Sequence, residues 1–232
     1  MWRLESEQGR WQTTQFQFQV DLRRPDRGWS DVRVDQKAYT DHLFELQLPG
    51  EANDQALTDS YVRQSDLVVT YAQSSDRTVL PQIVWRVIRD GQLRVGVECI
   101  LSMQTSLLAS HPGVSIRFRL AGELLNVSAA GAERIASGPH RWDEPTVLLQ
   151  RPDKGEHSLA LLMHPADFVR LDVCPTADEG WQADFAAFPE SLEKGVIRRA
   201  RVQAVYVSRH ADVELAQLCA NELKEAAPPL TT

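Results

Sequence analysis

The strongest candidates for a binding site lie on either side of the dipeptide Asp90-Gly91. Asp-Gly accepts the positive φ angles of a type I′ turn, so the sequence predicts a tight two-residue β-hairpin here. In this register Trp85 lies opposite Gly96 and beside Arg94, with Glu98 one pair further along. An indole face can stack on sugar C–H groups, while a carboxylate and a guanidinium exchange hydrogen bonds with hydroxyls. Trp85, Arg94 and Glu98 are therefore the leading candidates for a ligand-binding site.

The same three residues also have a purely structural interpretation. A tryptophan opposite a strand glycine fills the space that the missing side chain leaves. Arg94 and Glu98 are four residues apart on one strand, and they could simply form an ion pair at the surface. The sequence leaves both interpretations open.

A second candidate pair is His164 and Asp167 in the sequence HPAD. A carboxylate beside an imidazole orients the ring for general acid–base catalysis. In the alternative, Asp167 accepts hydrogen bonds from the backbone amides of a turn. No histidines have the i, i+2 spacing of two ligands on one strand face, and the cysteines form no CxxC pair. P-loop and GxGxxG motifs are also missing, so we expect no metal and no cofactor.

Residues 79–120 must position Trp85, Arg94 and Glu98, and their pattern predicts three consecutive antiparallel strands. Apolar residues occupy every second position from Leu93 to Met103, as in a strand with one buried face. Residues 114–120 alternate in the same way, and a four-residue connection at 109–112 would give both strands a common buried face. We expect a β-meander in which Ile88 shares the core face with the Leu93 series.

Alternation of apolar and polar residues recurs through the rest of the chain. The strongest pattern is at residues 14–22, where Phe16, Phe18 and Val20 alternate with polar residues. With the meander there are thirteen strand candidates, of which we expect about eleven to form strands. The other candidates are residues 32–34, 44–48, 61–73, 124–127, 147–150, 158–163, 168–174, 181–188 and 195–208.

The C-terminal segment has a different period. Asp212 is a suitable N-cap for a helix that continues to about residue 226. Its apolar stripe is formed by Leu215, Leu218, Cys219 and Leu223. The chain is therefore expected to be all-β, a large antiparallel two-sheet β-sandwich with a C-terminal α-helix. Because no linker or break in composition interrupts it, residues 1–232 are expected to form a single domain.

The number of long strands, together with the late strand introduced by LEKGVIRRARVQAVYVS, resembles the β-supersandwich of galactose-mutarotase-like carbohydrate proteins. The resemblance is architectural and covers most of the chain as a strand pattern. Sugar epimerases of that group resemble one another in using two histidines and a glutamate on the concave sheet. No such trio is evident in this sequence, and a shared fold does not imply a shared function.

The composition of the chain limits the classes of partner that we expect it to bind. The 232 residues are 43% hydrophobic, and a chain of this length can bury about 70% of its unfolded surface, as expected for an ordinary soluble globular protein. A net charge of -7 argues against nucleic acid, with Arg198, Arg199 and Arg201 expected on a solvated strand face. An apolar run of about 18 residues and a secretory signal are both missing, so we expect no membrane association and a cytoplasmic location.

Three function classes remain. The first is a non-catalytic module that binds a carbohydrate or another polar small ligand on a concave sheet face. The second is a carbohydrate-active isomerase or lyase that uses Glu98 or His164, with arginines as charge stabilisers. The third is an interaction scaffold that forms a homo-oligomer through an edge strand or the C-terminal helix. The first class is favoured, because no catalytic motif is found.

Overall fold

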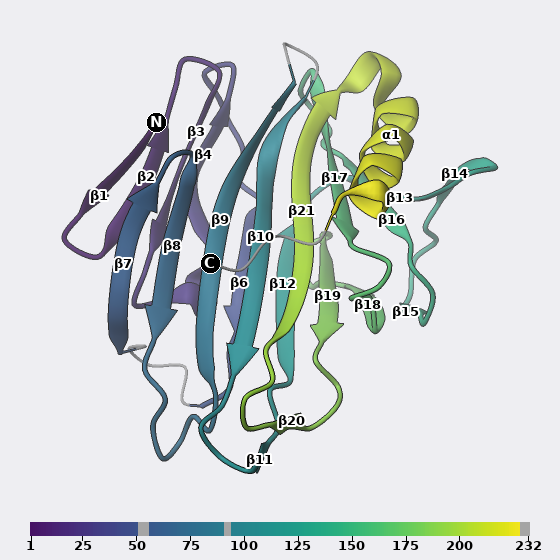
Figure 1. Cartoon of the computed structure of the whole chain (residues 1–232). Coiled ribbons are helices and arrows are strands. Elements are labelled where there is room, and N and C mark those ends of the chain that lie inside the picture. The colour runs from purple at the N-terminus through teal and green to yellow at the C-terminus, as the bar shows by residue number, and fades with distance from the viewer. Residues whose placement is uncertain (51–55, 91–93, 228–232) are drawn as a thin grey trace.

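The computed structural model describes residues 1–50, 56–90 and 94–227. Figure 1 shows a layered arrangement of antiparallel strands with the α-helix near the C-terminus packed on one side. The predicted fold class, an all-β sandwich with a C-terminal helix, is confirmed. The strands are more numerous than the sequence pattern predicts, because the predicted strand at 61–73 is a hairpin and because short strands form in segments without a clear alternating pattern.

The largest sheet has nine strands in the order β14-β13-β16-β17-β21-β10-β9-β8-β7. Their bounds are β7 Leu57–Arg63, β8 Asp66–Tyr71, β9 Leu80–Asp90, β10 Arg94–Gln104, β13 Glu123–Ser128, β14 Gly131–Arg134, β16 Val147–Arg151, β17 His157–Met163 and β21 Arg198–Ser208. Strand β21 pairs with both β17 and β10. The last strand of the chain therefore joins two blocks of strands that come from separate parts of the sequence.

The other layer contains two five-stranded sheets. One has the order β15-β18-β19-β12-β6, with bounds β6 His42–Gln47, β12 Val114–Leu120, β15 His140–Trp142, β18 Arg170–Pro175 and β19 Trp181–Ala187. The N-terminal sheet runs from β1 to β5, with bounds β1 Trp2–Glu5, β2 Gln8–Gln12, β3 Phe16–Asp21, β4 Trp29–Val34 and β5 Lys37–Ala38. The short strands β11 (Ala109–Ser110) and β20 (Leu192–Glu193) pair with each other. The 3-10 turns are η1 (Pro25–Arg27) and η2 (Arg209–Ala211).

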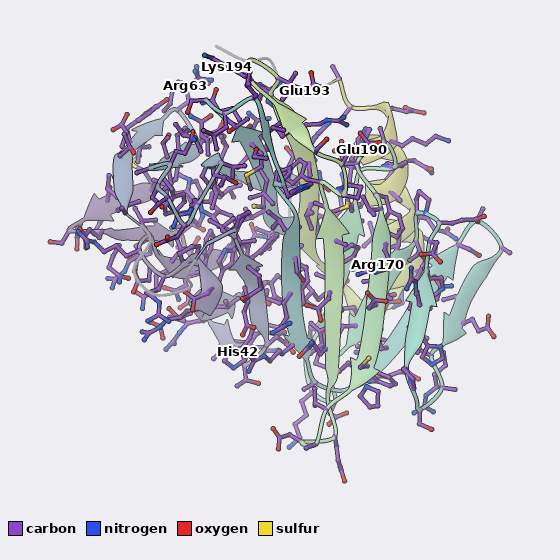
Figure 2. All side chains as sticks on the ribbon, turned by 90° about the horizontal axis from the view of Figure 1, so that it is seen from below. His42, Arg63, Arg170, Glu190, Glu193 and Lys194 are labelled. Atoms are coloured by element: carbon purple, nitrogen blue, oxygen red, sulfur yellow. The ribbon has the colours of Figure 1, made fainter. Side chains whose placement is uncertain are left out.

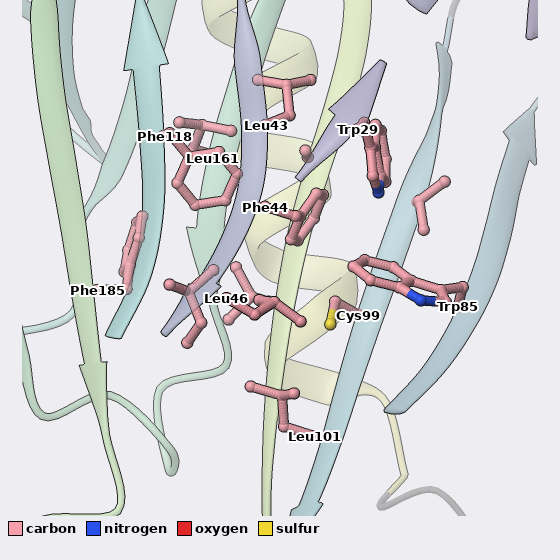
Figure 3. Close-up of a cluster of buried hydrophobic side chains, with 14 of the residues drawn as sticks. Trp29, Leu43, Phe44, Leu46, Trp85, Cys99, Leu101, Phe118, Leu161 and Phe185 are labelled. Atoms are coloured by element: carbon pink, nitrogen blue, oxygen red, sulfur yellow. The ribbon is translucent and has the colours of Figure 1, made fainter. Parts of the chain in front are cut away.

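The main core fills the space between these layers. Alternate side chains of strands in both layers meet there, as period-2 patterns require. Figure 3 shows Trp85 of the nine-stranded sheet beside Phe44 and Trp29 of the facing layer. The Trp85 ring centroid lies 5.3 Å from that of Phe44 and 5.9 Å from that of Trp29, in edge-on geometry. Seen from below in Figure 2, Arg63 and His42 lie on opposite sides of the molecule and mark the outer faces of the two layers.

The predicted three-stranded meander is wrong in its third strand. Strands β9 and β10 pair as expected, but β12 pairs with β6 and β19 in the facing sheet. The segment between β10 and β12, which includes β11, carries the chain from one layer to the other. Both layers bury alternate residues in the same core, so an alternating pattern cannot distinguish a neighbouring strand from one in the facing sheet.

The predicted register of the β9–β10 hairpin is also wrong. Arg94 pairs with Asp90 and Trp85 pairs with Cys99, where Gly96 was expected opposite Trp85. The expected turn residue Gly91 falls in residues 91–93, which lie outside the described residues. A register change by an odd number of residues exchanges the two faces. Trp85 therefore points into the core, and Ile88, expected in that core, packs on the opposite face.

Helix α1 (Asp212–Glu225) has almost the predicted bounds. Its N-cap position is Ala211, with no side-chain cap, so the predicted capping role of Asp212 is wrong. The Asp212 carboxylate instead accepts hydrogen bonds from Arg151 and Ser158 of the sheet. Leu218, predicted in the apolar stripe, is 43% exposed, because the helix is rotated to bury Cys219 and Leu223. Within the described ranges, no helix has the length and apolar character needed to cross a bilayer.

Candidate functional site

The outer face of the nine-stranded sheet is divided into two halves. Helix α1 contacts β13, β16, β17 and β21, and it encloses a second apolar cluster with them. We call this region the covered half. The open half is formed by the outward-facing side chains of β7, of β8, of β9 as far as Arg86, of β10 from Glu98 onward and of the N-terminal part of β21, and a groove of about 290 Å³ follows its surface. This groove is the candidate site.

Strand pairing arranges the outward side chains of the open half in three parallel rows. The charged row crosses five strands and contains Arg63, Asp66, Arg86, Glu98 and Gln203. The apolar row is Tyr61, Val68, Val84 and Ile100. The Arg199 row is Thr70, Gln82, Ser102 and Arg199. An apolar stripe therefore runs along the groove between two polar borders.

The apolar row provides a surface on which a ligand could rest. Val68 and Ile100 are buried in the floor, whereas Tyr61 at the edge strand is 41% exposed. Tyrosine combines a flat apolar ring with a hydroxyl, so it can cover a ligand face and also hydrogen bond to it. In the adjoining Arg199 row, the Gln82 amide donates to the Thr70 hydroxyl at 3.2 Å. This contact fixes the orientation of the amide at the groove border.

The charged row is a chain of ion pairs across the strands. Arg86 donates to Asp66, with Nη2 2.8 Å from Oδ2, and its Nη1 lies 3.7 Å from Glu98 Oε2. Glu98 also accepts from Arg201, whose Nη2 is 2.7 Å from Oε1. The hydrogen bonds to Asp66 raise the pKa of Arg86 above its ordinary value. These groups are held in place by one another, so the row is a preorganised polar wall.

Arg201 connects the open half to the covered half. Its side chain is almost fully buried, and its Nη1 donates to the carbonyls of Ala226 and Ala227 just after helix α1. The expectation that Arg201 lies on a solvated strand face is therefore wrong, because Glu98 and the end of the helix satisfy its charge. The Arg201–Glu98 pair marks the boundary between the halves.

A second groove of about 290 Å³ adjoins the first. Asp167, Phe168, Phe188 and Glu190 contribute to its lining, and Arg199 lines both grooves. Burial raises the pKa of the Asp167 carboxyl above its ordinary value, although the charge of His164 acts in the opposite direction. A carboxyl with a raised pKa in a groove can hold a proton for donation.

The predicted trio of Trp85, Arg94 and Glu98 does not share a face. Trp85 is 1% exposed and packs in the core, whereas Arg94 and Glu98 point to the outer face. Arg94 lies beneath helix α1, where its Nη1 donates to Glu222 Oε2 at 2.8 Å. Glu98 lies in the charged row beside the groove. The structure thus corrects the predicted arrangement, because the register change turns Trp85 inward.

The structure does bring His164 and Asp167 together. His164 Nδ1 lies 3.9 Å from Asp167 Oδ2, and it accepts a hydrogen bond from the Ala166 amide at 3.1 Å. Asp167 Oδ2 accepts from the backbone N–H of Arg201 at 3.0 Å. The turn interpretation is therefore only partly right, because the His164 ring accepts from a turn amide while Asp167 accepts from an amide of strand β21. The acid–base interpretation stays a prediction. Within the described residues, no three potential ligands gather as a metal site would require.

Most residues that line the groove of the open half were not predicted from the sequence. Tyr61 and Asp66 were placed within one long strand at 61–73, whereas the structure has a hairpin there. The signal was the run of four polar residues from Arg63 to Asp66 between apolar residues, and Gln64 within it has a φ of 55°. The charged row depends on pairing between segments more than 100 residues apart, for which the sequence carries no local signal.

No protein-family model and no curated protein matches the chain. Among solved structures, a putative aldose 1-epimerase from Klebsiella pneumoniae subsp. pneumoniae superposes with a TM-score of 0.59 at 5% identity, covering 97% of this chain and 87% of that one. The two chains share a fold. The predicted likeness to the galactose-mutarotase-like supersandwich is confirmed at that level.

A second match is the galactosidase domain of alpha-galactosidase-sucrose kinase, AgaSK. It has a TM-score of 0.47 at 9% identity, and the match covers 87% of this chain. The chain corresponds to 41% of the length of that protein.

Proposed function

We propose that this protein binds a carbohydrate in the groove of the open half. The observation that carries the proposal is the apolar row between two polar rows. A pyranose ring presents C–H groups on its faces and hydroxyls around its rim, which complements an apolar stripe with polar borders. Tyr61 is suited to cover one ring face, and the fixed side chains of Asp66, Arg86 and Gln82 are suited to the hydroxyls.

The shared fold supports the same ligand class. The solved structure with the TM-score of 0.59 is described as a putative aldose 1-epimerase, a protein named for a sugar reaction. Such a likeness leaves the chemistry open, because one fold hosts many functions. Our proposal is therefore confined to binding and treats residues 1–232 as one domain with the groove as its ligand site.

The test is a glycan array followed by calorimetry on the bound glycans, with Tyr61→Ala as the variant. Loss of the stacked ring should weaken binding about tenfold. The matched control is Val62→Ala, since Val62 is 40% exposed on the same strand and points to the other face. The control should bind like the wild type. Absence of binding to every glycan, or equal binding by the two variants, would rule out this site.

A carbohydrate-active enzyme is the second candidate, favoured by the raised pKa of Asp167 in the adjoining groove. Asp167→Asn keeps an acceptor for the Arg201 amide but cannot ionise. If Asp167 supplies or takes a proton, this variant should retain binding and lose turnover of the bound glycan. Glu98→Gln is a less informative variant, because Glu98 holds the buried Arg201 guanidinium and its loss would also affect the fold.

The interaction scaffold stays a prediction, as does a homo-oligomer. Helix α1 uses its buried residues Cys219 and Leu223 within the molecule, so they are not available to a second copy. An oligomer would need another surface, such as the edge strand β7. Analytical ultracentrifugation over a range of concentrations measures this directly.

A further inference from the structure

Arg199 differs from the neighbouring arginines. It lies on the outer face opposite Ser102, it is only partly exposed, and it lines both grooves. Among the described residues, it has no carboxylate within ion-pair distance. Arg198, next to it in the chain, pairs with Glu190, and Arg201 pairs with Glu98. A partly buried guanidinium with no ion-pair partner in the described part of the chain is thus located at the junction of two grooves.

A guanidinium in this position is a ready receptor for an anion. Its N–H groups match the two oxygens of a carboxylate or the oxygens of a sulfate, and partial burial reduces screening by water and salt. The lining of the open-half groove contains three arginines and one aspartate, although the whole chain carries a net charge of -7. The groove is therefore a local positive region on an acidic protein, and such a region attracts anionic ligands.

We infer that the ligand is an acidic saccharide, with its carboxylate or sulfate group paired to Arg199. This inference rests on the proposed carbohydrate-binding function. The apolar row supports the ring of one sugar unit, and Arg199 holds the anionic group at the border of that row. Because Arg199 also lines the adjoining groove, the neighbouring sugar unit extends over Asp167 and Phe168. The site accordingly takes an oligosaccharide across two subsites.

The experiment compares acidic and neutral glycans on the intact chain. An array carries oligosaccharides of polygalacturonate, alginate, hyaluronan and chondroitin sulfate beside neutral cello-, manno-, xylo- and galacto-oligosaccharides. The bound members should be acidic, and their binding should weaken as salt concentration rises. The strongest uronate is then compared with its carboxyl-reduced form, and the strongest sulfated glycan with its desulfated form. Removal of the anionic group should weaken binding about tenfold or more.

The variant Arg199→Gln assigns the effect to one residue. It should lower affinity for the acidic glycan about tenfold and leave affinity for the reduced or desulfated form unchanged. The control is Arg141→Gln, which removes the same charge from an exposed position on β15 that lines neither groove, and it should bind like the wild type.

The possible outcomes separate the two proposals. Preference for neutral glycans would overturn the inference and leave the carbohydrate site in place. Equal affinity of an acidic glycan for Arg199→Gln and for the wild type would mean that the anionic group binds elsewhere. This result would also overturn the inference. Failure to bind any glycan would reject both the inference and the proposed function.

Discussion

The two halves of the outer face of the nine-stranded sheet contain the same types of charged residue, but these residues have different roles. In the covered half, Arg151 pairs with Asp212 and Arg94 pairs with Glu222, so strand arginines fasten helix α1 to the sheet. In the open half, Arg86 pairs with Asp66 of the adjacent strand. Arg199 has no such partner among the described residues. The first set joins two elements, whereas the second set lines a groove.

Charge alone does not identify a binding face in this protein. Arg94 and Arg199 are both outward-facing arginines on central strands, yet one is covered by the helix and the other borders the groove. What separates them is the position of helix α1, which covers only part of the sheet. If the comparison is right, changes at the boundary and beneath the helix should affect stability, and changes in the open half should affect binding.

The largest effect is expected at the boundary, from Glu98→Ala. Glu98 and Arg201 are both almost fully buried, so removing the carboxylate leaves an uncompensated guanidinium beneath the end of the helix. Breaking a buried pair in this way costs about 3–5 kcal/mol of unfolding free energy. Chemical denaturation measures the loss. Glu190→Ala, which breaks an exposed pair with Arg198, should cost under about 1 kcal/mol. Similar losses in the two variants would contradict the comparison.

A smaller and pH-dependent effect is expected from Asp212→Asn under the helix. Burial would raise the pKa of Asp212, but hydrogen bonds from Arg151 and Ser158 prevail and lower it. A carboxyl with a lowered native pKa stabilises the fold above its unfolded-state pKa, and this contribution disappears as pH falls through the native value. The variant should lose about 2 kcal/mol at neutral pH.

Melting temperatures followed from neutral to acidic pH test this dependence. The difference between wild type and Asp212→Asn should shrink in the acidic range where the wild-type carboxyl becomes protonated. Glu214→Gln, at an exposed position in the same helical turn, is the control and should show little difference at any pH. A difference that stays constant with pH would mean that the Asp212 charge does not stabilise the helix contact.

The smallest effect on stability is expected from Arg199→Gln in the open half. Because Arg199 has no ion-pair partner in the described part of the chain, its loss should change the unfolding free energy by less than about 0.5 kcal/mol. The same variant is expected to bind acidic glycans poorly. A loss of stability as large as that of Asp212→Asn would make Arg199 a structural residue and remove the contrast between the halves.

Much of the fold could be predicted because burial on one face leaves a period-2 pattern. Phe16, Phe18 and Val20 are all buried on β3, as their alternation predicts. The pattern does not tell which sheet a strand joins, so β12 was placed beside β10 and is found in the facing layer. Fold class follows from such patterns, and strand order does not.

The candidate site was harder to predict than the fold class, because each part of it depends on which strands pair and in which register. An odd change of register was enough to turn Trp85 from the outer face to the core. Glu98 was selected correctly as an outward-facing acid on β10, but its partner Arg201 is 103 residues away in the sequence. Tyr61 lines the groove only because β7 pairs with β8 at the sheet edge.

The position of β21 between β10 and β17 has a consequence for how the chain folds. Strands β7 to β10 can pair as they are synthesised, and so can β13, β14, β16 and β17, but the two blocks meet only through residues 198–208. Until that segment is available, β10 and β17 are unpaired sheet edges with apolar side chains, which are prone to pair with other chains. The sheet therefore closes late, through long-range contacts that slow folding. A chain shortened before Arg198 should aggregate.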